Sequence, residues 1–316
     1  MNMKELLAVA NEHNFAIPAF NIGTGQMLTG IIAECEAQKS PVILAIHPLE
    51  LKFQGDAFIQ QVIKAANDTK IPCVIHLDHS GLKDIERAIR DGFTSVMIDA
   101  SHESFEDNVA ITKKVVELAH PLGVSVEAEL GTLAGIEDEV VVESGHESYT
   151  RPEEVEEFVD RTGCDSLAIA IGTSHGAYKF TPDQCTRNAD GILVPPPLRF
   201  DVLEECMKRL PEFPIVLHGS SSVPQEFVKM VNQYGGNMPD AVGIPEEQLR
   251  KAAELAVCKI NIDSDIRLAM TGNIRKYMAE HPDHFDPRQY LKPARQAVKD
   301  MVAHKIVNVL GSNGKA

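Results

Sequence analysis

The chain has 316 residues, of which 44% are apolar and 24% charged, a composition typical of a globular protein rather than a disordered one. Its 30 lysines and arginines against 46 aspartates and glutamates give a formal net charge of -16, which argues against a surface for nucleic acid or anionic membranes. A small anionic substrate is still compatible, because backbone amides, a metal or a few local cations suffice to bind one.

The six cysteines are scattered and form no C-x-x-C pair, which favours reduced thiols in a cytoplasmic compartment. Residues 1–14 lack the apolar core of a signal peptide. No run approaches the roughly 18 apolar residues that a membrane span needs. We therefore predict a soluble cytoplasmic protein.

Short apolar runs alternate with longer segments of helical periodicity along the chain. The strand candidates are 16–20, 42–46, 73–77, 95–98, 124–129, 166–171, 215–217 and 258–262. The helix candidates are 55–66, 81–90, 105–119, 152–161, 200–209, 225–233 and 245–257. Although the length also suits two smaller domains, repeated strand-then-helix units predict one α/β domain over residues 1–316, a (β/α)8 TIM barrel.

Polar side chains follow six of these runs, where the predicted strands end. In a barrel all strands end at one rim, where catalytic groups collect, whereas a doubly wound sheet would concentrate them at one crevice. The distribution therefore favours the barrel. The candidate rim residues are Asp78, His79, Asp99, Ser101, His102, Glu127, Glu129, His175, His218, Asn261, Asp263 and Ser264.

Two segments interrupt this alternation. Residues 135–151 are long, acidic and glycine-bearing, which predicts a mobile lid. Residues 181–199 contain three consecutive prolines and cannot form a helix interior, so we predict a Pro-rich surface insertion.

Three histidines, His79, His175 and His218, follow three different strands of the proposed rim. A lone histidine at a strand end usually caps backbone groups through hydrogen bonds. Three imidazoles with one open position are instead typical of catalytic zinc. Asp99 and Glu129 are expected either to orient these imidazoles or to form a second divalent or monovalent cation site.

Two segments carry a phosphate-binding pattern. Gly219-Ser-Ser221 follows the seventh run, and 261–264 ends the eighth before a helix predicted to begin near Asp265. Barrels often bind phosphate after strands seven and eight with backbone amides at a helix N-terminus. The alternative is that Ser222 and Ser264 are simply N-caps of the following helices.

Asp78, beside a proposed metal ligand at the end of a buried strand, is placed to exchange a proton with a substrate hydroxyl. It could instead hold a ligand imidazole by its second nitrogen. Metal, phosphate site and acid together suggest a phosphorylated carbonyl substrate. Aldol cleavage, isomerisation, epimerisation and metal-assisted phosphoester hydrolysis all fit this combination.

Six motifs occur in a familiar order and span nearly the whole chain. They are His76-Leu-Asp-His79, Val96-Met-Ile-Asp-Ala-Ser101, Val126-Glu-Ala-Glu-Leu-Gly131, Gly172-Thr-Ser-His-Gly-Ala-Tyr-Lys179, His218-Gly-Ser-Ser-Ser222 and Lys259-Ile-Asn-Ile-Asp-Ser-Asp265. Together they resemble the motifs of class II, metal-dependent fructose-1,6-bisphosphate aldolases.

The resemblance implies a catalytic Zn2+ on the three histidines, which polarises the ketose carbonyl and stabilises the enediolate left after the C3–C4 bond breaks. It implies that Asp78 transfers the proton at the C4 hydroxyl, with Glu137 as an assisting carboxylate. Asp99 and Glu129 match positions where the family has an alternative metal or cation site.

The resemblance also implies which residues bind the substrate and what the reaction is. Arg267 and Arg288 match arginines for the distal phosphate, the latter reaching from a neighbouring subunit, so a homodimer or homotetramer is expected. Asp263 matches the type that cleaves fructose 1,6-bisphosphate reversibly to dihydroxyacetone phosphate and glyceraldehyde 3-phosphate, with tagatose bisphosphate or another ketose phosphate as the alternative. The dihydroxyacetone phosphate half is expected against Gly176, Lys179, Gly219, Ser220, Ser221, Asn261, Asp263 and Ser264.

The chain departs from the family pattern after its second strand, where 47–52 replaces a Ser-containing Gly-Ala loop. His47 and Pro48 are therefore expected to alter the aldehyde pocket. Two alternatives remain beside a metal-dependent aldolase. One is a Schiff-base aldolase that uses Lys259 or Lys179, although a barrel-facing Lys259 paired with Glu127 or Asp263 explains that lysine equally well. The other is a non-catalytic sugar-phosphate-binding subunit.

Overall fold

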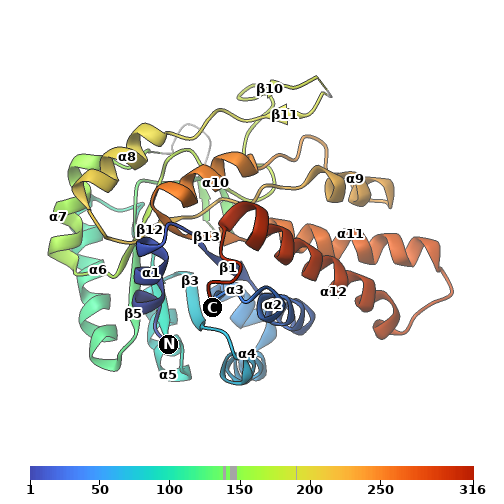
Figure 1. Cartoon of the computed structure of the whole chain (residues 1–316), viewed down its shortest axis with the longest axis horizontal. Coiled ribbons are helices and arrows are strands. Elements are labelled where there is room, and N and C mark those ends of the chain that lie inside the picture. Colours follow the sequence, from blue (N-terminus) through green and yellow to red (C-terminus); the bar gives the residue numbers. More distant parts are fainter. Residues whose placement is uncertain (138–139, 143–147, 190) are drawn as a thin grey trace.

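Eight parallel strands close into a barrel in the order β1-β13-β12-β8-β5-β4-β3-β2 (Figure 1). The computed structural model describes residues 1–137, 140–142, 148–189 and 191–316, with the backbone alone for 134–137 and 140–142. The predicted (β/α)8 TIM barrel is confirmed. Its strands are β1 (Ile17–Asn21), β2 (Val42–Ile46), β3 (Cys73–Ser80), β4 (Ser95–Ile98), β5 (Ser125–Leu130), β8 (Ser166–Ile169), β12 (Ile215–Leu217) and β13 (Val257–Ile262).

Helices surround the barrel and connect its strands (Figure 1). They are α1 (Met3–Glu12), α2 (Gly25–Gln38), α3 (Pro48–Gln54), α4 (Asp56–Asp68), α5 (Leu82–Asp91), α6 (Phe105–Ala119), η1 (His120–Leu122), α7 (Pro152–Thr162), α8 (Phe200–Arg209), α9 (Gln225–Gln233), α10 (Glu246–Leu255), α11 (Ser264–Glu280), α12 (Pro287–His304) and the π-helix η2 (Lys305–Leu310). No described helix is both long and apolar enough to cross a bilayer.

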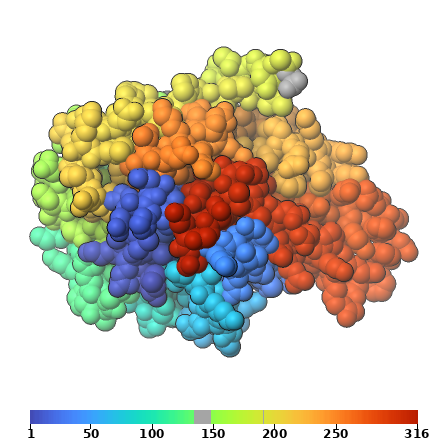
Figure 2. All heavy atoms as spheres, viewed as in Figure 1, coloured from blue at the N-terminus to red at the C-terminus, as the bar shows by residue number. Residues whose placement is uncertain are grey.

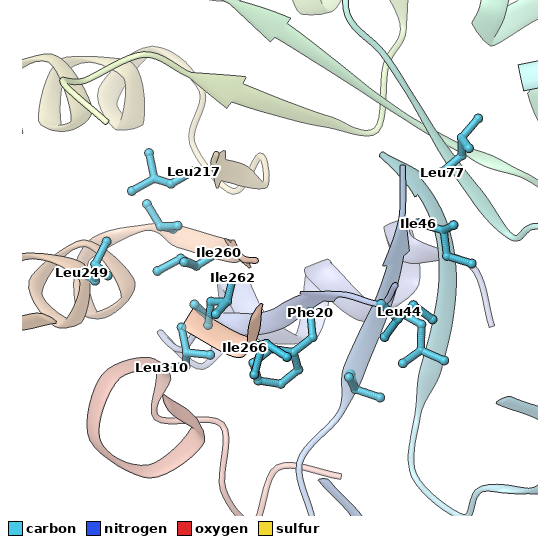
Figure 3. Packing of buried hydrophobic residues seen from close by; sticks show 14 of the residues in the cluster. Phe20, Leu44, Ile46, Leu77, Leu217, Leu249, Ile260, Ile262, Ile266 and Leu310 are labelled. Atoms are coloured by element: carbon cyan, nitrogen blue, oxygen red, sulfur yellow. The ribbon is translucent and has the colours of Figure 1, made fainter. Parts of the chain in front are cut away.

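The barrel strands are apolar on both faces because each lies between the barrel interior and a layer of helices. Strand β2 reads Val-Ile-Leu-Ala-Ile, and all five of its residues are buried. Alternate side chains point outward against the helices, and Figure 3 shows Leu44 and Ile46 beside Leu77 and Phe20 in this layer.

Helix α1 closes the end of the barrel at which the strands begin. Met3 and Leu7 lie in one buried cluster with inward-facing residues such as Ile17 and Ile43. The Lys4 backbone N–H donates to the hydroxyl of Ser125, the first residue of β5, at 3.0 Å. This end is filled by apolar side chains, so the opposite rim, where the strands end, is the face that can present polar groups.

The segment predicted as a lid contains two short strands, β6 (Ala134–Glu137) and β7 (Val140–Val142). They form a three-stranded sheet with β9 (Ser174–His175), in which Gly135 is opposite His175. Residues 138–139 and 143–147 of this segment lie outside the described residues. The mobility of the segment stays a prediction.

The Pro-rich segment 181–199 projects from the top of the molecule in Figure 2. It contains a small antiparallel pair, β10 (Thr186–Arg187) with β11 (Leu193–Val194). Leu193, Pro195 and Leu198 are buried and anchor its second half against the body of the protein.

Candidate active site

The three histidines predicted as metal ligands meet at the rim where the barrel strands end. His79 lies in β3, His218 directly follows β12, and His175 ends β9. The ring centroid of His79 is 5.0 Å from that of His175 and 4.4 Å from that of His218. The rings of His175 and His218 are 6.5 Å apart.

The backbone of β3 is distorted where it supplies two neighbouring polar side chains to the site. His79 has φ 36°, in the left-handed region that costs a residue with a side chain roughly 1 kcal/mol or more. The register with β4 shifts between Leu77 and Ser80 at the same place. A regular strand would turn Asp78 and His79 to opposite faces, so this irregularity lets both reach the rim.

Carboxylates fix the orientation of two of these imidazoles. His79 Nδ1 is 3.1 Å from Asp99 Oδ2, and His218 Nε2 is 2.7 Å from Glu127 Oε1. The remaining nitrogens, His79 Nε2 and His218 Nδ1, are 2.8 Å apart and face each other. Metal-binding histidines typically give their second nitrogen to a carboxylate in this way, so the donor set fits a metal ion. The sequence left open that Asp78 holds a ligand imidazole by its second nitrogen. In the structure Asp99 makes this contact, with His79.

The protonation of His218 is compatible with metal binding. Burial, with the Lys259 ammonium nearby, lowers the pKa of His218 to about 4, so its ring is neutral near pH 7. Only a neutral imidazole offers a lone pair to a metal. A ligand atom from each of His79, Asp99 and Glu129 also lies within 4.8 Å of the others, so these three residues form a group that could hold a cation.

His76, two residues before Asp78, is a buried imidazole inside strand β3. Its ring is fully buried, and Nδ1 lies 2.8 Å from the Ser95 hydroxyl. Burial lowers the pKa of His76 to about 3, which keeps this ring neutral as well.

Two amides hold the carboxylate of Asp78 in place. Asn21 Nδ2 donates to Asp78 Oδ2 at 2.8 Å, and Asn261 Nδ2 lies 3.0 Å from both oxygens. Burial alone would raise the pKa of Asp78, but the nearby His79, His218 and Lys259 hold it well below its usual range. The site therefore contains an oriented, ionised carboxylate next to His79 and His218.

Lys259 lies beneath this site, inside the barrel. Its Nζ donates to Glu127 Oε1 at 2.8 Å, and both side chains are fully buried. This is the structural pairing with Glu127 that the sequence allowed. Lys179, the other lysine considered as a nucleophile, is also buried, and its ammonium donates to the carbonyl of Ser174.

A cavity of about 240 Å³ opens at the same rim. All eight residues predicted for the dihydroxyacetone phosphate half line it, together with Asp78, His175, His218 and Arg267. The Ser221 hydroxyl accepts hydrogen bonds from the backbone N–H groups of Asp263 and Ser264, both at 3.1 Å. Asp263 is the N-cap and Ser264 the first residue of α11, so Ser221 lies at a helix N-terminus, where the dipole favours an anion.

The serines of this region are not the helix caps that the alternative interpretation required. The N-cap residues of α9 and α11 are Pro224 and Asp263, and neither makes a side-chain cap hydrogen bond. Proline has no side-chain acceptor, and the Asp263 carboxylate accepts instead from Arg267 Nε. Gly219 has φ 59° and lies against the backbone of Ser174, where an added Cβ would come within 2.7 Å. The loop therefore packs closely on the segment that carries His175.

The part of the cavity near Arg267, where the resemblance implies the distal phosphate, is also lined by His47. Residues 48–54 form helix α3, with the His47 ring accepting from Leu49 N–H at its start, and His47 lines the cavity. Arg267 Nε donates to Asp263 Oδ1 at 2.6 Å, and its Nη2 lies 3.2 Å from Glu50 Oε1. Arg267 thus links Asp263, which is predicted to bind substrate, to Glu50, which lies in the segment 47–52 that departs from the family pattern.

Two predicted site residues are not assembled with the others. Arg288 begins α12, pairs with Asp286 at 2.6 Å, and is not among the described residues that line the cavity. Its side chain is 90% exposed, so it is accessible to another copy of the chain. Glu137 ends β6, but its side chain lies outside the described part of the structure.

The sequence did not assign two residues that the structure places in contact with the site. Asn21 ends β1 and binds Asp78, and Glu50 binds Arg267. Glu127 was a candidate rim residue, but its contact with His218 was not predicted. Asn21 could have been found as a site candidate, because it is a polar residue at a strand end of the barrel. Glu50 had no such signal, since its role depends on α3 lying over Arg267.

The chain is similar to known proteins over its whole length. A family model described as "Fructose-bisphosphate aldolase class-II" matches residues 1–315. The fructose-bisphosphate aldolase of Treponema pallidum (strain Nichols) is 54% identical over 325 residues, which covers 100% of this chain and 97% of that protein. The fructose-bisphosphate aldolase of Giardia intestinalis is 46% identical over 317 residues, an alignment that covers 99% of this chain and 94% of that protein.

The solved structures agree with the sequence relatives. The crystal structure of the YdjI aldolase from Escherichia coli K12 superposes with a TM-score of 0.77 at 30% identity, covering 100% of this chain and 98% of that one. A family match from end to end, relatives of this identity and a shared barrel lead to one conclusion. The chain belongs to the class II fructose-bisphosphate aldolase family.

Proposed function

We propose that the protein is a zinc-dependent aldolase that cleaves fructose 1,6-bisphosphate reversibly to dihydroxyacetone phosphate and glyceraldehyde 3-phosphate. The observation that carries the proposal is the placement of the Asp78 carboxylate beside His79 and His218, at the mouth of a cavity lined by phosphate-binding groups. Membership of the class II family and relatives named fructose-bisphosphate aldolase support it.

His79, His175 and His218 would hold the zinc, with Asp99 and Glu127 fixing the orientation of the first and third rings. When bound there, zinc supplies an electrophile that polarises the ketose carbonyl and stabilises the negative charge that develops beside it. Glu129 is proposed to contribute with Asp99 to a second cation site.

Asp78 is proposed to take the proton from the C4 hydroxyl during cleavage and to return it during condensation. Asn21 and Asn261 keep both carboxylate oxygens in a fixed position, so one of them can face the hydroxyl without side-chain rearrangement. Because Asp78 is 1% exposed, water competes little for the proton. Glu137 is proposed to assist from the β6 segment.

Substrate binding is proposed to divide between two phosphates. The first would lie against Lys179, the loop 219–221 and the N-terminus of α11, with Gly176 and Asn261 alongside. The second would meet Arg267, together with Arg288 of a neighbouring subunit. This proposal requires a homodimer or homotetramer.

Metal removal and add-back tests the proposed chemistry. We expect thorough chelation to abolish cleavage of fructose 1,6-bisphosphate and stoichiometric zinc to restore it. Asp78→Ala should lower kcat by about 10²- to 10⁴-fold at unchanged zinc content, whereas Asp283→Ala, an exposed aspartate on the α11–α12 connection, should not. Cleavage that persists without metal, or full turnover by Asp78→Ala, would contradict the proposal.

A substrate panel at fixed zinc separates the alternatives. Fructose and tagatose bisphosphates, fructose 1-phosphate and non-phosphorylated fructose differ in C4 configuration and phosphate number. A preference for fructose 1,6-bisphosphate supports the proposal. Faster cleavage of another ketose would show that the aldehyde product is not glyceraldehyde 3-phosphate or that the C4 configuration differs. Borohydride treatment with substrate should give no adduct, because Lys259 is paired with Glu127. No turnover of any ketose would favour a non-catalytic subunit.

A cytoplasmic location is proposed from the cysteines. All six lie in the described part of the chain and form no disulfide, and burial raises the pKa of four of them, Cys73, Cys164, Cys206 and Cys258, to about 12. Buried thiols with raised pKa values are structural rather than reactive, as is common in reducing compartments. Fractionation with activity measured in each fraction tests this location.

A further inference from the structure

Lys305 is a buried cation that the proposed chemistry does not use. It begins the π-helix η2 after α12, and its side chain is 1% exposed. Burial alone would lower its pKa, but the carboxylates of Asp265 and Glu246 raise it, so the ammonium stays charged. The Nζ atom lies 2.6 Å from Glu246 Oε1 and 2.7 Å from Asp265 Oδ2, and it donates to the Ser222 hydroxyl at 2.6 Å.

The carboxylate of Asp265 connects this cation to the loop that follows β12. Asp265 is fully buried, and its Oδ2 accepts from the Ser222 backbone N–H at 3.0 Å and from the Ser222 hydroxyl at 3.2 Å. Its Oδ1 accepts from the Val223 backbone N–H at 2.7 Å. Asp265 is the second residue of α11, so these contacts tie the start of that helix to the loop.

The loop needs such a tie because its backbone is strained. Val223 has φ 50°, a left-handed conformation that is a genuine outlier for a β-branched residue. Such residues persist only when their surroundings hold them in place. On the other side, Gly243 packs so closely that an added Cβ would lie 2.3 Å from the Ser222 carbonyl carbon.

The same loop and helix form the anion end of the cavity. Ser220, Ser221 and Ser264 all line it, and Ser221 accepts from the N–H groups of Asp263 and Ser264. Removing the charge of Lys305 would leave the buried carboxylate of Asp265 and the half-buried carboxylate of Glu246 around one serine hydroxyl. Their mutual repulsion would separate the loop from α11, and the serine side chains that line this end of the cavity would move apart.

We propose that Lys305 is a positioning residue for the substrate phosphate. By holding Asp265 against Ser222, it keeps the loop at 219–223 and the first turn of α11 in the arrangement that binds the anion. The assignment of that anion to dihydroxyacetone phosphate rests on the proposed function. The C-terminal turn of the chain thereby controls affinity for phosphorylated ligands without touching them.

The test compares Lys305→Met with Lys299→Met in the zinc-loaded, full-length protein. Lys299 is a half-buried lysine on α12 that pairs with Glu34 away from the cavity, so its replacement is the matched control. We expect Lys305→Met to raise KM for fructose 1,6-bisphosphate by about 10- to 100-fold, the range typical of residues that hold a ligand-binding group in place. The value of kcat should stay within about threefold of wild type. The phosphate contact stabilises the bound substrate and the transition state equally, so its loss affects KM alone.

Calorimetry gives a second readout that does not depend on turnover. The Kd values for inorganic phosphate and dihydroxyacetone phosphate should rise in Lys305→Met, whereas that for dihydroxyacetone should not. An unchanged Kd for phosphate in the folded variant overturns the proposal, as does a loss confined to kcat. If wild type fails to cleave fructose 1,6-bisphosphate, the proposed function is wrong, yet the phosphate measurements still decide the role of Lys305.

A second variant covers the case in which Lys305→Met does not fold. Asp265→Asn keeps an amide oxygen for the Val223 N–H but loses the charge that Lys305 pairs with. It should weaken inorganic phosphate binding in the same direction. Wild-type affinity in Asp265→Asn would overturn the proposal independently.

Discussion

Arg267 lines the cavity and is the residue proposed to bind the distal phosphate. It carries one positive charge but contacts two carboxylates, Asp263 and Glu50. Taken together the three groups have a net negative charge, which repels an approaching phosphate. A bisphosphate must therefore displace or share at least one of these contacts before Arg267 can bind it.

Replacing Glu50 with Gln should strengthen binding of the bisphosphate. The contact at 3.2 Å is partly exposed, with Arg267 45% accessible, so a modest effect is expected. We expect KM for fructose 1,6-bisphosphate to fall by about two- to fivefold, while KM for fructose 1-phosphate is unchanged. Glu34→Gln, which removes a carboxylate from the remote Lys299 pair, is the control. An equal change for both substrates would show that Glu50 does not act through the distal phosphate.

Glu246 should make stability depend on pH in the acid range. Burial alone would raise its pKa, yet the charge and hydrogen bonds of Lys305 and His304 lower it from its ordinary value of 4.5 to about 2. Since the folded pKa is the lower one, the stabilisation is present above about pH 4.5 and disappears as the pH falls towards 2.

Urea denaturation of metal-free wild type and Glu246→Gln measures this contribution. Wild type should be more stable by about 1–3 kcal/mol at pH 7, and the difference should shrink at pH 3. Glu247→Gln, at the exposed neighbouring position, should match wild type at both pH values. If the stability difference between wild type and Glu246→Gln grew as the pH fell, the lowered pKa of Glu246 would not be the cause.

At the scale of single residues, the sequence identified most of the candidate site residues but not the contacts that hold them in place. His79, His175, His218 and the phosphate segments were identifiable because each follows a strand, and strand ends meet at one rim. The amide contacts of Asp78 were not identifiable, since Asn21 and Asn261 are 57 and 183 residues away from it along the chain. The left-handed conformation of His79 had no signal either, because it depends on how β3 and β4 pair.

At the scale of elements, periodicity located the strands with little error. Strands β2, β4 and β12 have the predicted bounds, and helices α6, α8 and α9 do as well. Helix α3 was missed because Pro48 suggests a break, although proline suits the first turn of a helix, where its missing N–H is not needed. Its length of seven residues also gives little periodicity to detect.

The turn between α8 and β12 allows a paired test of backbone conformation. Glu212 has φ 65° and is exposed, so Glu212→Gly should stabilise the protein by roughly 0.5–1 kcal/mol by relieving a left-handed side chain. The same substitution at Glu204, exposed in the interior of α8, should destabilise it by about 1 kcal/mol. Chemical denaturation of the two variants should give shifts of opposite sign. Shifts of the same sign would contradict the conformational explanation.

At the scale of the whole molecule, α11 and α12 extend together away from the barrel (Figure 1). Arg288 begins α12 on this projection, and the neighbouring Phe285 is 91% exposed. Arg288 is not among the described residues that line the cavity of its own chain. The arrangement suits a projection that delivers Arg288 to another subunit.

Mixing two inactive variants tests whether sites are shared between subunits. Asp78→Ala and Arg288→Ala should each be strongly impaired alone. If each site takes Arg288 from its partner, random mixing makes half of the dimers mixed with one intact site each, so about a quarter of wild-type activity should return. Light scattering should show a dimer or larger. No recovery in a mixture shown to exchange subunits would place Arg288 outside the shared site.

Closure of the barrel has a consequence for how the protein is made. Strand β1 pairs with β2 on one side and with β13 on the other, where Ile17 is opposite Lys259. At roughly 5–20 residues per second, the ribosome delivers β13 only some tens of seconds after β1 has emerged. During that interval one edge of β1 has no native partner, and exposed edges favour pairing with other chains. The nascent protein should therefore depend on chaperones until its last strand is released, and slowing translation ahead of β13 should increase aggregation.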